Sequence, residues 1–202
     1  MAEPSLLVLK RRRLRVRPGV ISEDRVYFEL KRVLGRSWPI RFYADRRSHI
    51  LFLDTRWILV DTRYFPCAIA EVIEQVTGRP YSQVLYEMGR RMGEITADHY
   101  IEREITGENL LLITAAIAAR TGWGLYYPFE INSDSFRIIG YNSFESDSFV
   151  FNRINTWAPT CALTSGFLAG IMGRYFGAPC EVKEVRCRSK GDPYCLFEGR
   201  VG

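Results

Sequence analysis

The chain has 202 residues, 47% of them hydrophobic, and a formal net charge of +5. This size allows one well-buried core with an appended N-terminal segment. A membrane-spanning protein is excluded, because no apolar run reaches the length that crosses a bilayer. No linker, repeat or low-complexity stretch divides the chain, which favours a single α+β domain after the N-terminal segment.

The positive charge is concentrated at the N-terminus. Residues 1–50 hold 13 Lys or Arg against 5 Asp or Glu, whereas the rest of the chain holds 15 against 18. The run from Lys10 to Arg17 fits either a patch for nucleic acid or an acidic partner, or an edge strand with one solvated arginine face. No DNA-binding motif or interleaved aromatic residue accompanies the run, so we favour the edge strand and do not expect nucleic-acid binding.

Short strands are predicted at 6–10 and 14–18, and a hairpin at 41–54. Their alternating apolar residues are too few to be stable alone and need a sheet to join. These residues are Leu7, Leu9, Leu14 and Val16. We therefore expect residues 1–50 to form a basic strand region that makes the chain a homodimer, and residues 51–202 to form the domain proper.

Three helices are predicted next, at 66–78, 80–104 and 107–120. Pro66 opens the first and Gly78 ends it. The third is nearly all apolar, as is typical of a helix buried on most sides. In the second, Gly89 and Gly93 would let another helix approach closely. Its predicted apolar stripe is Leu85, Met88, Met92 and Ile95.

The pattern then changes to a period of two, which predicts strands at 123–132, 135–142 and 144–152. A helix at 159–176 follows, with a stripe of small residues that permits close packing or leaves room for a ligand. The stripe is Ala162, Gly166, Ala169 and Gly173. A β-hairpin closes the chain, with turn residues at 189–192 between its two strands.

Four of the five cysteines fall between Cys161 and Cys195. Cys187 and Cys195 flank the turn of the hairpin, Glu184 lies just upstream, and Cys161 comes from the preceding helix. Three thiolates and a carboxylate can hold a dication such as zinc in a closed tetrahedral site. A Cys187–Cys195 disulfide and buried, unreactive thiols are the alternatives that the spacing leaves open.

The five cysteines also bear on the compartment. Their odd number and spacing do not form a small-domain disulfide framework. Residues 1–4 lack the layout of a signal peptide, because the basic run follows the first apolar residues instead of preceding them. We therefore expect a reducing, cytoplasmic environment.

The cysteine pattern resembles the 4-vinyl reductase domain family. The resemblance rests on Cys161 followed by SGFLAG, on the run from Glu184 to Cys187, and on GDPYC ending at Cys195. TGWG at 121–124 and YNSFES at 141–146 also resemble family segments, and the likeness spans about residues 50–199. It implies an antiparallel sheet with packed helices, shared with the TRAPP-like subunits, and a zinc held by Cys161, Glu184, Cys187 and Cys195.

The same resemblance includes the sensory domains of regulators that detect phenols. It implies a mainly apolar pocket between the 107–120 helix, the sheet and the 159–176 helix, with Tyr141 as its polar tip. The candidate lining is Ile113, Ile117, Trp123, Phe136, Ile138, Tyr141, Phe144 and Phe167. Near Ile113 the relatives have a histidine that this chain lacks, so a hydrocarbon, lipid or tetrapyrrole fits better than phenol.

No hydrolase, nucleotide-binding or metalloprotease motif is present, and a closed zinc site has no open position for substrate. We therefore favour a binding protein over an enzyme, although the sequence leaves catalysis open. The main hypothesis is a zinc-stabilised sensor domain that binds a small hydrophobic or aromatic ligand and acts through a partner. The alternatives are a TRAPP-like scaffold without a small ligand and an accessory protein of tetrapyrrole biosynthesis.

Overall fold

The computed structural model describes residues 43–44, 50–52, 55–154 and 156–202. The predicted strands at 6–10 and 14–18, the arginine run and the proposed dimerisation segment lie outside the described residues. Within the described part, β1 (Tyr43–Ala44), β2 (Ile50–Phe52) and β3 (Thr55–Trp57) form a small antiparallel sheet in that order. Ala44 pairs with Ile50, which confirms the hairpin predicted at 41–54.

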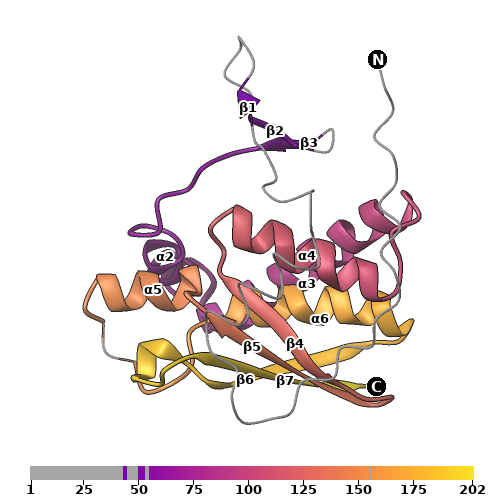
Figure 1. The fold of residues 1–202 in the computed structure, drawn as a ribbon. Helices are drawn as coiled ribbons and strands as arrows, with labels where there is room; N and C mark the ends of the chain where they lie inside the picture. Colours follow the sequence, from indigo (N-terminus) through magenta and orange to yellow (C-terminus); the bar gives the residue numbers. More distant parts are fainter. Residues whose placement is uncertain (1–42, 45–49, 53–54, 155) are drawn as a thin grey trace.

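The main sheet has four antiparallel strands in the order β4-β5-β7-β6. They are β4 (Leu125–Ile131), β5 (Ser135–Tyr141), β6 (Cys180–Arg186) and β7 (Cys195–Val201). The helices lie above one face of this sheet, as Figure 1 shows. They are α2 (Cys67–Thr77), α3 (Tyr81–Ile101), α4 (Glu108–Arg120), α5 (Phe144–Phe151) and α6 (Ala162–Phe176). The predicted α+β fold is therefore confirmed.

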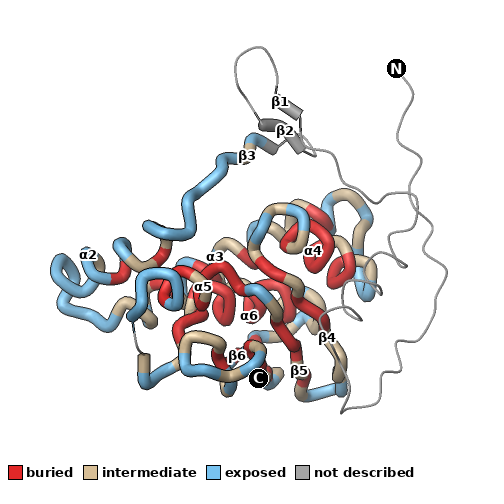
Figure 2. Tube along the Cα trace, turned by 60° about the vertical axis from the view of Figure 1, so that its left-hand side comes forward, coloured by how far each residue is buried: buried red, intermediate tan, exposed pale blue. Residues whose placement is uncertain are grey.

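The core lies between the helices and the sheet, where the buried residues gather in Figure 2. Its centre joins Leu110 and Ile117 of α4, Ile171 of α6, and Phe136 and Phe197 of the sheet. As predicted, α4 is buried over most of its length, because eight of its residues contact the core from several sides. None of the helices among the described residues has the length and apolar character needed to cross a membrane.

One predicted strand is wrong, because residues 144–151 form the helix α5. Alternation of phenylalanine and serine favoured a strand, but the buried side chains include Phe144, Glu145, Ser148 and Phe149, which recur at helical spacing. Ser143 precedes the helix in an extended conformation, and Glu145 and Asp147 add negative charge to its first turn. Both features favour a helix start.

Helices α3 and α6 run in the same direction with their backbones in close contact. A Cβ atom added at Gly89 or Gly93 would lie less than 3.0 Å from backbone atoms of α6, and one at Gly166 or Gly170 would do the same on α3. The close approach predicted from Gly89 and Gly93 is therefore confirmed. On α6 the space beside Gly166 is filled by α3 and is not left for a ligand.

The predicted apolar stripe of α3 is wrong in its orientation. Only Leu85 belongs to the buried face, which Gly89, Gly93, Ala97 and Tyr100 complete, while Met88 and Ile95 are exposed. The glycines replace large apolar residues here, because they let a neighbouring backbone come closer than any side chain would.

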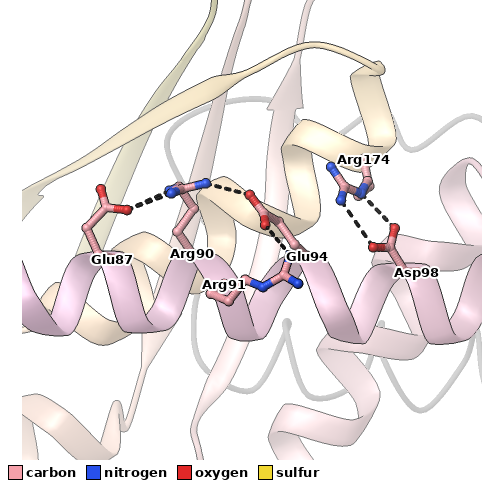
Figure 3. A network of polar contacts seen from close by, with 6 residues as sticks. All are labelled: Glu87, Arg90, Arg91, Glu94, Asp98 and Arg174. Atoms are coloured by element: carbon pink, nitrogen blue, oxygen red, sulfur yellow. Dashed lines mark hydrogen bonds and ion pairs between the residues drawn. The ribbon is translucent and has the colours of Figure 1, made fainter.

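Charged side chains join α3 and α6 along their exposed edge, as Figure 3 shows. Arg174 Nε in the last turn of α6 lies 2.6 Å from Asp98 Oδ1 on α3. Arg90 bridges Glu87 and Glu94 along α3 at 2.7 and 2.6 Å. Exposed pairs of this kind contribute little stability each, so the close glycine contact dominates the packing of the two helices.

Candidate metal centre and ligand cavity

Four side chains that are far apart in the sequence form one buried cluster. Cys161 lies at the N-cap of α6, Glu184 in β6, Cys187 just after β6, and Cys195 at the start of β7. One candidate ligand atom from each lies within 4.8 Å of all the others. The structure thus brings together the four residues that the sequence proposed as metal ligands.

The shape of the closing hairpin explains how Cys187 and Cys195 meet. The pairing of β6 with β7 shifts register between Glu184 and Arg186. A short 3-10 helix at Arg188–Lys190 follows, and Gly191 then turns the chain with a φ of +92°, which favours glycine. Asp192 Oδ2 accepts a 2.9 Å hydrogen bond from the Cys187 N–H and fixes the turn.

Short polar contacts surround the sulfur atoms. Cys161 Sγ lies 3.8 Å from Cys195 Sγ and 3.4 Å from Ser143 Oγ, and Cys187 Sγ lies 3.1 Å from Ser189 Oγ. All five cysteines are free, so the structure contains no Cys187–Cys195 disulfide. Cys180 begins β6 outside the cluster, and its thiol contacts the carbonyl of Ala178.

The electrostatics of the cluster favour a bound cation. Glu184 Oε2 accepts a 2.9 Å hydrogen bond from the Cys161 N–H, whereas Oε1 is buried without a hydrogen-bond partner among the described residues. Burial raises the pKa of Glu184 to about 8 and also raises the pKa of Cys161. Hydrogen bonds from the other two thiols lower the pKa of Cys187. A dication would offset this burial of negative charge, so the donor set fits a thiophilic metal.

Two further buried residues support the cluster and were not proposed as site residues from the sequence. Ser143 Oγ accepts a 2.9 Å hydrogen bond from the Tyr126 hydroxyl and also contacts Cys161 Sγ. Glu145 accepts hydrogen bonds from the N–H groups of Leu163 and Thr164, at 3.0 and 2.6 Å, and so caps the start of α6. The YNSFES segment contains both residues and was the available sequence signal.

The Glu145 cap makes stability depend on pH. Burial raises the pKa of this carboxyl from 4.5 to about 7, so the folded protein holds its proton more tightly than the unfolded chain does. Its contribution is complete below pH 4.5 and is lost as pH rises through 7. We expect the wild type to lose about 3 kcal/mol over this interval relative to Glu145→Gln, measured by urea unfolding. Parallel stability curves for the two proteins would contradict this prediction.

An apolar cavity of about 40 Å³ lies between α4, the sheet and α6. Its apolar walls include Leu111, Trp123, Ile138, Phe167 and Met172. Three hydroxyl-bearing side chains also line it, namely Thr114, Tyr126 and Thr164. An apolar wall with a few polar groups is typical of a small-molecule site.

The structure divides the candidate ligand residues among several places. Trp123, Ile138 and Phe167 line the cavity, whereas the other five candidates do not. Phe136 stacks on Phe176, and Phe144 stacks on Phe65. Ile113 and Ile117 pack against the main core.

Tyr141, the expected polar tip, contacts Tyr194 in a separate apolar cluster, with ring centres 6.0 Å apart. Tyr126 lines the cavity instead, and its hydroxyl donates to Ser143 Oγ next to the metal cluster. Tyr126 therefore joins the cavity to the cluster.

Comparison with known proteins agrees with this architecture. Residues 144–201 match the family model of the 4-vinyl reductase domain. The fold resembles the phenol-responsive sensory domain of the transcription activator PoxR with phenol, with a TM-score of 0.68, 19% identity, and coverage of 91% of this chain and 92% of that one. A vinyl-4-reductase family protein from Methanocaldococcus jannaschii gives a TM-score of 0.52 and 22% identity, with coverage of 72% and 84%.

A trafficking protein particle complex subunit 3 from Naegleria fowleri is more distant, with a TM-score of 0.46, 11% identity, and coverage of 70% of this chain and 95% of that one. No curated protein matches the sequence. The antiparallel sheet, the covering helices and the cysteine–glutamate cluster together define an α+β domain of the 4-vinyl reductase type. The stretch that matches the family model, residues 144–201, contains all four residues of the cluster.

Proposed function

We propose that this chain is a ligand-binding sensor domain that takes a small hydrophobic or aromatic molecule. The observation that carries the proposal is the apolar cavity between α4, the sheet and α6, with Trp123 and Phe167 in its wall. The likeness of the fold to a domain described as phenol-responsive supports the same conclusion. Output would pass through a partner protein, because the residues that the structure describes form only the sensor-like domain.

We further propose that zinc occupies the cluster of Cys161, Glu184, Cys187 and Cys195. Three thiolates and one carboxylate would complete a tetrahedral shell and leave no position for a substrate. The metal would therefore fix the closing hairpin to the start of α6 and act structurally. Tyr126 and Ser143 connect this hairpin to the cavity, so ligand binding and the metal site share one rigid support.

The size of the cavity limits the ligand. An engineered protein cavity of about 150 Å³ takes up benzene, so a cavity of about 40 Å³ must expand to admit one aromatic ring. The flexible side chain of Met172 lies in the wall and can adapt at low cost. A tetrapyrrole would need far more space, which counts against pigment chemistry in this cavity and in favour of a single-ring or short hydrocarbon ligand.

A thermal-shift screen with phenol, alkylbenzenes and short fatty acids tests this function. At about a hundredfold excess over its Kd, a ligand stabilises the folded state by ~2.7 kcal/mol, which raises Tm by about 5 to 10 °C for a chain of this size. Ala118→Leu, which fills the cavity, should abolish the rise. Ala68→Leu on the exposed face of α2 should retain it. If no compound raises Tm, the scaffold hypothesis replaces the sensor.

We also propose that the domain is a homodimer through its N-terminal strands. The apolar residues Leu7, Leu9, Leu14 and Val16 motivate this proposal, because so short a set of strands needs a sheet to join. Deleting residues 1–20 should convert dimers into monomers or aggregates in multi-angle light scattering. A truncated chain that remains dimeric would show that another surface makes the dimer.

A further inference from the structure

A second, larger cleft lies on the outer side of α3. It has a volume of about 620 Å³, within the range of small-molecule sites, and it is separate from the metal cluster. Its roof is the segment 56–65, which links β3 to α2 and is drawn largely as exposed in Figure 2. Its inner end is formed by Trp123, Phe144 and Leu163, so the Trp123 ring separates it from the inner cavity.

Apolar side chains that face solvent line this cleft. Ile58 and Leu59 in the roof are 73% and 86% exposed, and Ile95 in the floor is 54% exposed. The floor uses Met88, Met92 and Ile95, three residues of the stripe that the sequence assigned to the core. Contiguous exposed apolar surface of this kind marks a place where something binds.

His99 continues the same face of α3 and supplies a polar group to the cleft. Arg103 Nη1 lies 3.1 Å from His99 Nδ1 and can only donate, so Nδ1 accepts in the neutral ring and the proton resides on Nε2. In the imidazolium form Nε2 also carries a proton. This Nε2–H group is buried without a hydrogen-bond partner among the described residues. A buried donor without an acceptor is costly, and a ligand oxygen would satisfy it.

The charges around the cleft indicate the sign of the ligand. Arg56 is the one charged residue in the described lining, and Arg103 stands directly behind His99. Two cationic groups and a free N–H donor at an apolar cleft suit an anion with a long apolar tail. We propose that this cleft binds a medium-chain monocarboxylate, with its carboxylate accepting from His99 Nε2–H and its chain lying over Met92 and Ile95.

Isothermal titration of the full chain with decanoate, below its micellar concentration, tests the site. We expect one decanoate per chain. Ile95→Asp should weaken binding more than tenfold, because it places a negative charge against the ligand. Val150→Asp is the matched control, since Val150 is 47% exposed on α5 outside the cleft and its replacement should leave the affinity unchanged.

The donor is tested separately. His99→Phe should weaken decanoate binding by about tenfold or more, but 1-decanol binding by only about threefold, because hydrogen bonds to charged groups are the stronger ones. His99→Gln, which keeps an N–H donor, should restore most of the affinity for decanoate. The Tm rise caused by ligands of the inner cavity should be unaffected by Ile95→Asp, so the two sites can fail independently.

Three results would overturn the proposal. One is the absence of binding heat, and another is equal decanoate affinity for the wild type, Ile95→Asp and His99→Phe, which would place the ligand elsewhere. The third is a wild-type dimer that Ile95→Asp converts to a monomer without decanoate binding to either protein. That outcome would show that a second copy of the chain covers the cleft.

Discussion

Replacing Cys187 with alanine is expected to remove the bound metal and to destabilise the fold by more than about 4 kcal/mol. Cys187 is fully buried and lies in the cluster that joins the closing hairpin to α6. The free energy of structural zinc binding is folding free energy, so losing one thiolate removes a large part of the stability of a domain this size. Elemental analysis for zinc and urea unfolding measure the two effects.

Cys180→Ala is the matched control for this experiment. Cys180 is also buried and begins the same hairpin, but its thiol contacts only the Ala178 carbonyl and lies outside the cluster. Its replacement should retain the metal and cost about 1 to 2 kcal/mol, as is typical of deleting a small buried side chain. Equal zinc content and equal stability in the two variants would show that the cluster is a set of packed thiols.

The second large effect is expected at the contact of α3 with α6. Gly166→Ala should cost about 3 kcal/mol or more, because its Cβ atom would lie less than 3.0 Å from backbone atoms of Tyr86 and Arg90. Neither helix can yield locally, since backbone atoms lie on both sides of the contact. Denaturant unfolding followed by circular dichroism gives the difference from the wild type.

Gly173→Ala in the same helix serves as the control. Its Cβ atom would lie 3.4 Å from the Ala178 carbonyl oxygen, which is an ordinary contact. Alanine is also the better helix former, so this variant should be as stable as the wild type or up to about 1 kcal/mol more stable. If Gly166→Ala were equally well tolerated, the close backbone contact between α3 and α6 would be refuted.

The metal cluster and most helices were predictable from the sequence because each depends on local spacing. Cys187 and Cys195 flank a hairpin turn, and a hairpin brings its two ends together whatever the rest of the fold does. Gly78 ends α2 with a φ of +64°, as its place after a periodic apolar run predicted. Such signals are contained within a few residues.

The cavity was harder to predict because its lining depends on which way each side chain faces. Phe136 and Ile138 of β5 share one face of the sheet with Gly140, so Tyr141 must lie on the other face with Ile139. The period-two rule would have excluded Tyr141 from the cavity. The exposure of Met88 and Ile95 could not be foreseen in the same way, since a helix contact made by glycines has no apolar periodicity.

Native mass spectrometry of the untagged chain, purified without chelator and with ethylbenzene added, tests the sensor function most directly. The spectrum reports metal, ligand and subunit number together. We predict a species that carries one zinc ion per chain and gains the mass of one ethylbenzene per chain, with the gain lost in Ala118→Leu. A chain that carries no zinc and gains no ligand mass would contradict the assignment of a zinc-stabilised, ligand-binding sensor domain.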